Sequence, residues 1–333
     1  MKAIVYSSYG PPDVLRLEDI PKPAPGDDDV VMRVRASTVN PADWHFMRGT
    51  PYLIRLMSGL RKPKITQLGI DVAGEVEVVG RNVTQFKPGD HVFGWCHGAF
   101  AEYAKIPASS IVTTPTGVTF EQAACVPVAA VTALQGLRNK GRIQPGQNVL
   151  INGGSGGVGT FAVQIAKSFG AAVTAVCSTR NVEMVRSIGA DRVIDYTRES
   201  FTEGDQRYDL ILDNAGNHSL SEIRRVLRPK GRYVQVGGPD KGQWIGPMAA
   251  PLKALVFSGI ASQKFVMFIA KGNRDDMTTV SDLIEAGKMT PVIDRRYGLS
   301  DVADAIRYLE EGHARGKVVI NVEHHDGTDR EDG

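Results

Sequence analysis

Residues 150–159 read Leu-Ile-Asn-Gly-Gly-Ser-Gly-Gly-Val-Gly, and this stretch decides the fold of the chain. A short apolar run ends at Ile151, and Gly154, Gly156 and Gly159 match the pattern G-x-G-x-x-G. Apolar residues at helical spacing follow: Val158, Phe161, Ala162, Ile165 and Ala166. A strand, a tight turn and a helix N-terminus in this order expose backbone N–H groups and the positive end of a helix dipole. The stretch therefore predicts a site for the pyrophosphate of a dinucleotide.

Strands and helices alternate around this stretch. Residues 119–122, Thr-Phe-Glu-Gln, predict a helix start with a capping box. Strands are expected at 148–152, 172–177, 191–194, 208–212 and 232–236, with helices at 158–169, 181–188 and 218–227. This alternation predicts an α/β fold with a doubly wound parallel sheet.

The segments before and after this region have a different sequence pattern. The first part is rich in β-branched runs bounded by Gly and Pro, which predict strands at 3–6, 30–36, 72–79 and 91–94. The last part predicts helices at 276–287 and 302–311 and a closing strand at 317–322. We expect that closing strand to rejoin the first domain, and the polar tail at 324–333 to be frayed.

The composition is that of an ordinary globular protein, with 42% hydrophobic and 23% charged residues in 333. The net charge of +2 argues against nucleic acid or an anionic membrane as the main partner. We see no leader pattern and no apolar run long enough to span a membrane. Cys96, Cys125 and Cys177 are odd in number and lack C-x-x-C spacing, so we expect reduced thiols and a cytoplasmic location.

The end of the second predicted strand bears on cofactor choice. In a dinucleotide fold this position meets the adenosine ribose, and NAD specificity usually places Asp or Glu there. Here residues 178–181 read Ser-Thr-Arg-Asn, with no acid. The Ser178 hydroxyl and the Arg180 guanidinium suit a 2′-phosphate, which favours NADPH over NADH. The alternative is a helix-capping serine beside a surface arginine.

With these residues in hand, the chain resembles the medium-chain dehydrogenase/reductase superfamily, in its zinc-independent quinone oxidoreductase branch. The resemblance covers about residues 1–322 and is carried, besides the glycine motif, by the stretches at 40–43, 69–76, 87–92, 98–103, 189–196, 287–294 and 312–319. It implies a GroES-like β domain (1–118 and 270–323) packed against a Rossmann domain (119–269), with a cofactor cleft between them. It also implies a homodimer.

The resemblance implies cofactor contacts at particular positions. Ser155, Gly156, Gly157 and Val158 would lie at the pyrophosphate, Ser178, Arg180 and Tyr196 around the adenosine phosphate, and Thr132 near the nicotinamide. Gly237 and Gly238, after the fifth strand, would let the backbone approach the cofactor. For Tyr196 the alternative is a half-buried aromatic residue.

No metal site is expected. Zinc-dependent relatives carry Cys where this chain has Asn40, and Gly-His-Glu where it has Gly69-Ile70-Asp71. Ile70 has no donor atom, and an amide is a poor zinc ligand compared with thiolate or imidazole. Without zinc there is no Lewis acid for alcohol oxidation, which argues against an alcohol dehydrogenase.

An NADPH enzyme of this kind is expected to reduce a quinone or an activated C=C bond in a small apolar conjugated substrate. The catalytic candidates are Asn40, Asp43 and His45. Asn40 has a turn-forming alternative, Asp43 a structural one, and His45 simple packing. The apolar stretch 51–65 is a candidate lid, and Trp244, Phe257, Phe265 and Phe268 are candidates for the opposite wall or for core packing.

Two other functions stay open. One is an enoyl reductase acting on a biosynthetic or thioester-linked intermediate, because the same fold and hydride chemistry serve both reactions. The other is a non-catalytic protein that binds NADPH.

Overall fold

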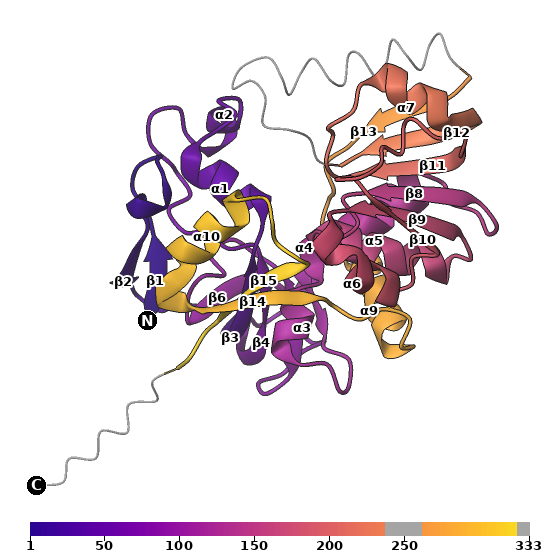
Figure 1. Ribbon diagram of the computed structural model, residues 1–333. Coiled ribbons are helices and arrows are strands. Elements are labelled where there is room, and N and C mark those ends of the chain that lie inside the picture. The colour runs from indigo at the N-terminus through magenta and orange to yellow at the C-terminus, as the bar shows by residue number, and fades with distance from the viewer. Residues whose placement is uncertain (237–261, 325–333) are drawn as a thin grey trace, which may run out of the picture.

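The computed structural model describes residues 1–236 and 262–324 and shows two lobes, each built on its own β-sheet (Figure 1). Gly237 and Gly238 of the expected cofactor site lie outside the described residues, as do Trp244, Phe257 and the tail from residue 325. None of the described helices is long and apolar enough to cross a membrane.

The first lobe contains a seven-stranded sheet to which both ends of the chain contribute. Its spatial order is β14 (Ile293–Gly298), β15 (Lys317–Asn321), β3 (Asp29–Val39), β4 (Asp71–Val79), β5 (His91–Trp95) and β7 (Ile111–Thr113), with β6 (Tyr103–Pro107) paired to β3. β1 (Lys2–Val5) and β2 (Arg16–Asp19) form a separate antiparallel pair. β15 pairs antiparallel with β3, so a strand from the C-terminal part of the chain lies inside the sheet that β3 to β7 form.

Short helices cover this sheet and its edges: α1 (Pro41–Arg48), α2 (Ile54–Ser58), α3 (Phe120–Ala124) and α10 (Val302–Glu310). α10 packs on α1 and β15, and its Val302 and Ile306 share a buried cluster with Met47 and Ile320. Thr119 caps α3 in the predicted capping box with Gln122. This packing holds the end of α1, at Met47, against the last described strand.

The second lobe contains a parallel sheet of six described strands. Its order is β10 (Arg192–Asp195), β9 (Ala172–Cys177), β8 (Asn148–Asn152), β11 (Tyr208–Asp213), β12 (Leu227–Gln235) and β13 (Lys264–Met267). The described helices of this lobe are α4 (Pro127–Leu134), which continues into η3 (Gln135–Lys140), α5 (Gly157–Ser168), α6 (Val182–Ser187), α7 (Leu220–Val226) and α9 (Arg274–Glu285).

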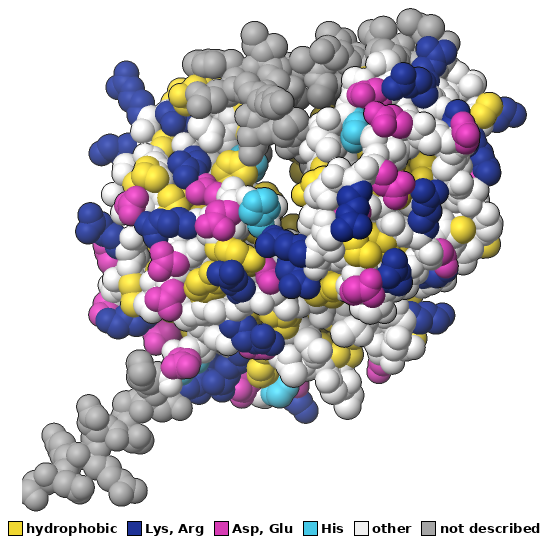
Figure 2. All heavy atoms as spheres, in the orientation of Figure 1, with side chains coloured by type: hydrophobic (Ala, Val, Ile, Leu, Met, Phe, Trp, Pro, Cys, Tyr) yellow, Lys and Arg dark blue, Asp and Glu magenta, His cyan; other side chains and the backbone are white. Residues whose placement is uncertain are grey.

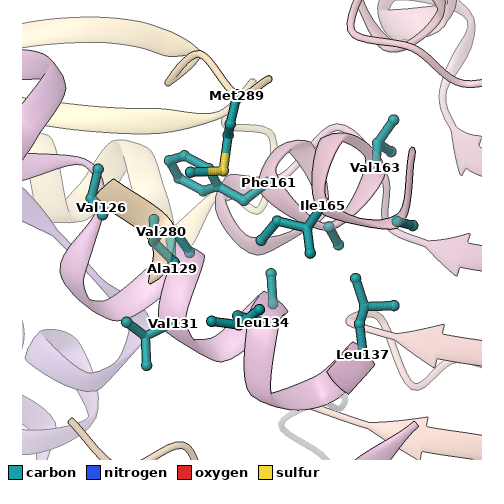
Figure 3. Packing of buried hydrophobic residues seen from close by; sticks show 14 of the residues in the cluster. Val126, Ala129, Val131, Leu134, Leu137, Phe161, Val163, Ile165, Val280 and Met289 are labelled. Carbon is teal, nitrogen blue, oxygen red and sulfur yellow. The ribbon is translucent and has the colours of Figure 1, made fainter. Parts of the chain in front are cut away.

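Both faces of the parallel sheet are buried. Val149 and Ile151 of β8 belong to the cluster that contains Phe161 of α5 and Leu134 of α4, shown in part in Figure 3. Leu150 points to the other face, where it shares a cluster with Ile223 of α7. Because successive strand residues face opposite sides, this alternation requires helices on both faces. The predicted α/β class and doubly wound parallel sheet are confirmed.

One predicted boundary differs from the structure by more than three residues. The pattern places a helix up to residue 227 and a strand from 232, but β12 begins at Leu227, directly after α7. Leu227 pairs with Tyr208 ahead of a register shift, and Lys230 adopts a positive φ of 65°. Residues 229–231, Pro-Lys-Gly, therefore lie within the strand and mark an irregularity in it.

Candidate cofactor and active site

The glycine loop between β8 and α5 is shaped by steric exclusion. A Cβ atom at Gly159 would lie 2.0 Å from the Gly153 carbonyl oxygen, and one at Gly154 would lie 2.9 Å from the Ala175 Cβ. Gly153 itself has a φ of +80°. Gly156 is the N-cap residue of α5 and, as a glycine, has no side chain that could cap the first N–H groups of the helix. Ser155, Gly157 and Val158 complete this loop and the first turn, which is an arrangement that suits a pyrophosphate.

The three residues expected at the adenosine phosphate gather where β9 and β10 end. Ser178 follows β9, and the Tyr196 backbone N–H donates to the Cys177 carbonyl at 3.0 Å. The Tyr196 side chain is 58% exposed. Arg180 is exposed and donates from Nη2 to the His313 carbonyl oxygen at 2.6 Å. Arg180 therefore links the parallel-sheet lobe to the loop before β15.

That loop also contacts the glycine loop. The Gly316 N–H donates to the Ser155 carbonyl oxygen at 2.9 Å. A Cβ at Gly316 would lie 2.3 Å from the Val292 carbonyl oxygen, so a side chain would disrupt this approach. Figure 2 shows the surface hollowed between the two lobes, with Lys and Arg side chains gathered beside the hollow. The two lobes thus meet where the sequence predicts the cofactor.

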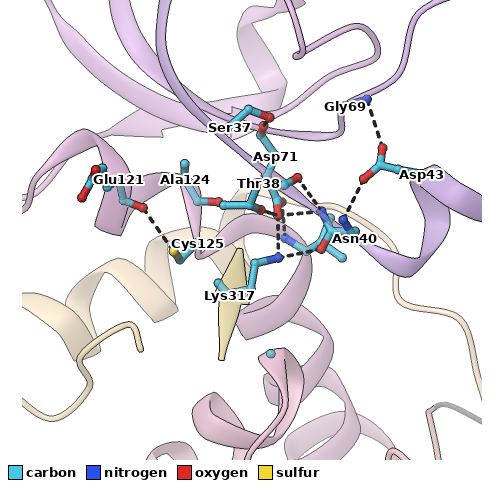
Figure 4. Close-up of polar contacts among 12 residues, drawn as sticks. Ser37, Thr38, Asn40, Asp43, Gly69, Asp71, Glu121, Ala124, Cys125 and Lys317 are labelled. Carbon is cyan, nitrogen blue, oxygen red and sulfur yellow. Dashed lines mark hydrogen bonds and ion pairs between the residues drawn. The ribbon is translucent and has the colours of Figure 1, made fainter. Parts of the chain in front are cut away.

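A buried polar network lies at this junction (Figure 4). Lys317 Nζ donates to Asn40 Oδ1 at 2.6 Å and to Asp71 Oδ2 at 3.0 Å. Asn40 Nδ2 donates to the same Asp71 oxygen at 2.8 Å, and Val128 N donates to Asp71 Oδ1 at 2.8 Å. Lys317 is 3% exposed and Asp71 is fully buried. Both ends of the Asn40 amide are therefore engaged within the protein.

Asp43 occupies a structural position at the start of α1. Its Oδ2 accepts from the Asn40 N–H at 2.8 Å, which forms the capping box of the helix, and its Oδ1 accepts from the Gly69 N–H at 3.0 Å. Burial raises the pKa of Asp43 to about 7, and the nearby Asp71 carboxylate adds to the rise. The carboxyl group ties α1 to the segment before β4.

His45 lies two residues further along α1, half-buried and stacked on Trp44 with ring centroids 3.8 Å apart. Its Nδ1 is 2.8 Å from the Thr50 carbonyl oxygen. A carbonyl only accepts, so Nδ1 carries the proton and Nε2 is protonated only in the imidazolium form. The ring can therefore donate a proton from Nε2 when it is charged.

Of the remaining residues that the sequence singled out, some lie at the surface and others in the core. Thr132 is buried on α4. In the candidate lid, Leu53, Leu56 and Leu60 on and around α2 are 47%, 67% and 67% exposed. Phe265 is 5% exposed and packs against Tyr233 inside the lobe, so core packing, the alternative for this residue, describes it.

Three polar residues of the site were missed as site residues by the sequence analysis: Asp71, Asn181 and Lys317. Each lies inside a stretch singled out for another reason, at 69–76, 178–181 and 312–319. Their partners are distant in sequence, and local patterns do not reveal such pairs.

Comparison with known proteins places both parts of the chain. Residues 26–116 match the family model described as "Alcohol dehydrogenase GroES-like domain", and residues 188–320 match that described as "Zinc-binding dehydrogenase". The chain is 33% identical to a 2-methylene-furan-3-one reductase of Solanum lycopersicum, over 96% of this chain and 79% of that protein. It is 34% identical, with the same coverage, to a chloroplastic NADPH-dependent alkenal/one oxidoreductase of Arabidopsis thaliana. The structure of a quinone oxidoreductase from Coxiella burnetii aligns with a TM-score of 0.85 at 30% identity, over 97% of this chain and 99% of that one.

The donor set at the zinc-binding positions does not fit zinc, although the second family description mentions it. Ile70 has no donor atom, and the Asn40 amide and Asp71 carboxylate are engaged with Lys317. Burial raises the pKa of the Cys96 thiol to about 12, with smaller contributions from the Asp71 and Asp43 carboxylates. Burial therefore favours the neutral form of this thiol.

Proposed function

The chain belongs to the medium-chain dehydrogenase/reductase superfamily, in its quinone oxidoreductase branch, and on this basis we propose that it reduces a quinone or the activated C=C bond of a small enone or enal. It is an NADPH-dependent oxidoreductase. The observation that carries the substrate class is that Lys317 engages Asn40 and Asp71, two positions at which the resemblance places Cys and Glu in zinc-dependent relatives. A reaction without a Lewis acid requires an acceptor that is already electron-poor.

The residues of the cleft suit NADPH. The glycine loop offers backbone N–H groups and a helix N-terminus to the pyrophosphate, and Gly156 leaves open space because a Cβ there would meet only the Gly153 carbonyl oxygen, at 3.7 Å. Ser178 and Arg180 would hold the 2′-phosphate, since no carboxylate follows β9 directly to repel it. Tyr196 would lie beside this phosphate and Thr132 near the nicotinamide.

Bound NADPH supplies a hydride. The chain's own residues then position the acceptor and handle the negative charge that develops on its conjugated oxygen. His45, in its imidazolium form, would donate the proton from Nε2, with Thr50 fixing the ring through Nδ1. Asn40 and Asp43 would act by holding the start of α1, Asn40 through Lys317 of β15 and Asp43 through the Gly69 N–H before β4. The exposed apolar side chains around α2 would cover an apolar substrate.

The test is oxidation of NADPH and NADH against benzoquinone, phenanthrenequinone, an alkenal and crotonyl-CoA, with EDTA present. We expect NADPH-preferring turnover of a quinone or the alkenal that EDTA does not change. Turnover of crotonyl-CoA alone would replace this proposal with the enoyl reductase. Tight NADPH binding with no turnover of any acceptor would support the non-catalytic alternative. Loss of activity with EDTA would refute the metal-free assignment.

We also propose a homodimer that acts in the cytoplasm. β13 is one of the two outermost strands of the parallel sheet within the described part of the chain, β10 being the other, and an edge strand offers unpaired backbone groups to a second copy. All three cysteines are free and buried, as suits a reducing compartment. Sedimentation of the purified protein tests the dimer, and a monomer at micromolar concentration would refute it.

A further inference from the structure

Asn181 occupies a helix N-cap position that its side chain does not use. It stands before α6 and is 4% exposed, yet its side chain makes no capping hydrogen bond to that helix. Asn181 has helical backbone angles (φ −105°, ψ −5°) at the end of η4 (Thr179–Asn181), whereas a side chain that caps a helix usually belongs to a residue with extended angles, so the amide bonds to other partners. The amide nitrogen Nδ2 lies 3.0 Å from Ser155 Oγ and 3.2 Å from Ser178 Oγ.

The two serines come from different loops of the cofactor site. Ser155 belongs to the glycine loop after β8, and Ser178 follows β9. One buried amide therefore joins the residue expected at the pyrophosphate to the residue expected at the 2′-phosphate. The Ser155 backbone is also held, because its carbonyl oxygen accepts from Gly316.

The direction of these hydrogen bonds decides what each serine can offer a ligand. A hydroxyl group has one donor hydrogen and two acceptor lone pairs. Where Nδ2 donates to each Oγ, a lone pair of each serine is used and its hydrogen is left to donate. Oδ1 is buried and has no hydrogen-bond partner among the described residues. If the amide were flipped, the NH₂ group would occupy that position and would have no acceptor there. A buried N–H group without an acceptor is rarer than a carbonyl without a donor, which favours the orientation described.

We propose that Asn181 is a positioning residue for NADPH, which sets the Ser155 and Ser178 hydroxyls as donors toward the pyrophosphate and the 2′-phosphate. The inference rests on the cofactor site assigned above and goes beyond it by naming a residue that touches neither phosphate. It predicts that the two anionic ends of the site are coupled through a single side chain.

The test is the dissociation constant of NADPH and of NADH, measured by calorimetry on the whole chain. Each neutral hydrogen bond is worth about a two- to tenfold change in affinity. We expect Asn181→Ala to weaken NADH about threefold, through Ser155, and NADPH about tenfold, through both serines. The preference for NADPH over NADH therefore falls about threefold. In a Ser178→Ala background, Asn181→Ala should leave that preference unchanged.

Two further variants separate positioning from folding. Asn181→Asp keeps the side-chain size but replaces the donor with acceptors and a charge, so it should weaken NADPH more than Asn181→Ala does. The control is Asn321→Ala, which removes an amide in the sheet of the other lobe. That amide also donates to a side-chain oxygen, Glu121 Oε1 at 3.0 Å. This variant should change the dissociation constant of neither NADPH nor NADH. Thermal unfolding confirms that each variant is folded.

Three results would overturn the proposal. Equal weakening of NADPH and NADH by Asn181→Ala would show a merely structural role. The same loss of preference with and without Ser178 would show that Asn181 does not act through that serine. An unchanged NADPH affinity in Asn181→Asp would show that the amide donor does not position the serines. A wild-type protein that binds neither nucleotide would instead refute the cofactor assignment itself.

Discussion

Removal of the Lys317 ammonium group should destabilise the fold far more than removal of an ordinary surface lysine charge. Lys317 is 3% exposed and lies 3.0 Å from the Asp71 carboxylate, which is fully buried. The change Lys317→Met keeps most of the side-chain volume but leaves that carboxylate without its cation. Asn40 and Val128 still donate to it, but they do not neutralise its charge.

The expected loss follows from this burial. Removing one partner of a buried ion pair costs about 3–5 kcal/mol, because the remaining charge is neither solvated nor compensated. Domains commonly have free energies of unfolding of only about 5–15 kcal/mol, so the change is a large fraction of the total. Replacing both partners, as Lys317→Met with Asp71→Asn, removes the uncompensated charge and should restore most of the loss.

The assay is urea unfolding monitored by intrinsic fluorescence, with Lys167→Met as the matched control. Lys167 pairs with Asp191 at 2.7 Å, but their side chains are 36% and 50% exposed. An exposed pair contributes about 0–1 kcal/mol, so this control should lose little stability. Equal losses for Lys317→Met and Lys167→Met would refute the reasoning, and so would a double variant less stable than Lys317→Met alone.

Three further changes test the site. In Gly159→Ala the new Cβ would lie 2.0 Å from the Gly153 carbonyl oxygen, so the loop must move and NADPH should bind at least about tenfold more weakly, as one lost charge-assisted contact implies; Gly204→Ala, whose nearest neighbour is at 4.0 Å, is the control. Arg180→Ala should weaken NADPH and spare NADH in calorimetry, and equal effects on both would contradict its assignment to the 2′-phosphate. Burial raises the pKa of Asp43 to about 7, while an unfolded Asp titrates near about 4. Between about pH 4 and pH 7 the folded chain therefore binds more protons than the unfolded chain. Its free energy of unfolding should fall as the pH rises through this range. Asp43→Asn should flatten that part of the stability profile, and an unchanged slope would show that another group titrates there.

The local chemistry of the glycine stretch was readable from the sequence. Gly159 admits no side chain because its neighbour is the carbonyl of Gly153, only six positions earlier in the chain. The strand β8 was predicted with the bounds that the structure has, and β9 likewise. These features depend on steric limits and on hydrophobic periodicity, which act over a few residues. The capping box of Thr119 and Gln122 is equally local.

The polar centre of the site required the tertiary structure. Lys317 meets Asn40 across 277 positions of the chain and Asp71 across 246, and Asn181 meets Ser155 across 26. No periodic pattern links such residues, because their contact depends on β15 entering the sheet beside β3 and on the parallel order of β8 and β9. The sequence by itself determined the strand–turn–helix that suits a dinucleotide and the absence of an acid directly after β9. Only the order of the strands in the seven-stranded sheet, with β15 and β4 on either side of β3, decided which buried charges neutralise each other. Burial, not sequence spacing, makes a lone charge too costly to leave unpaired.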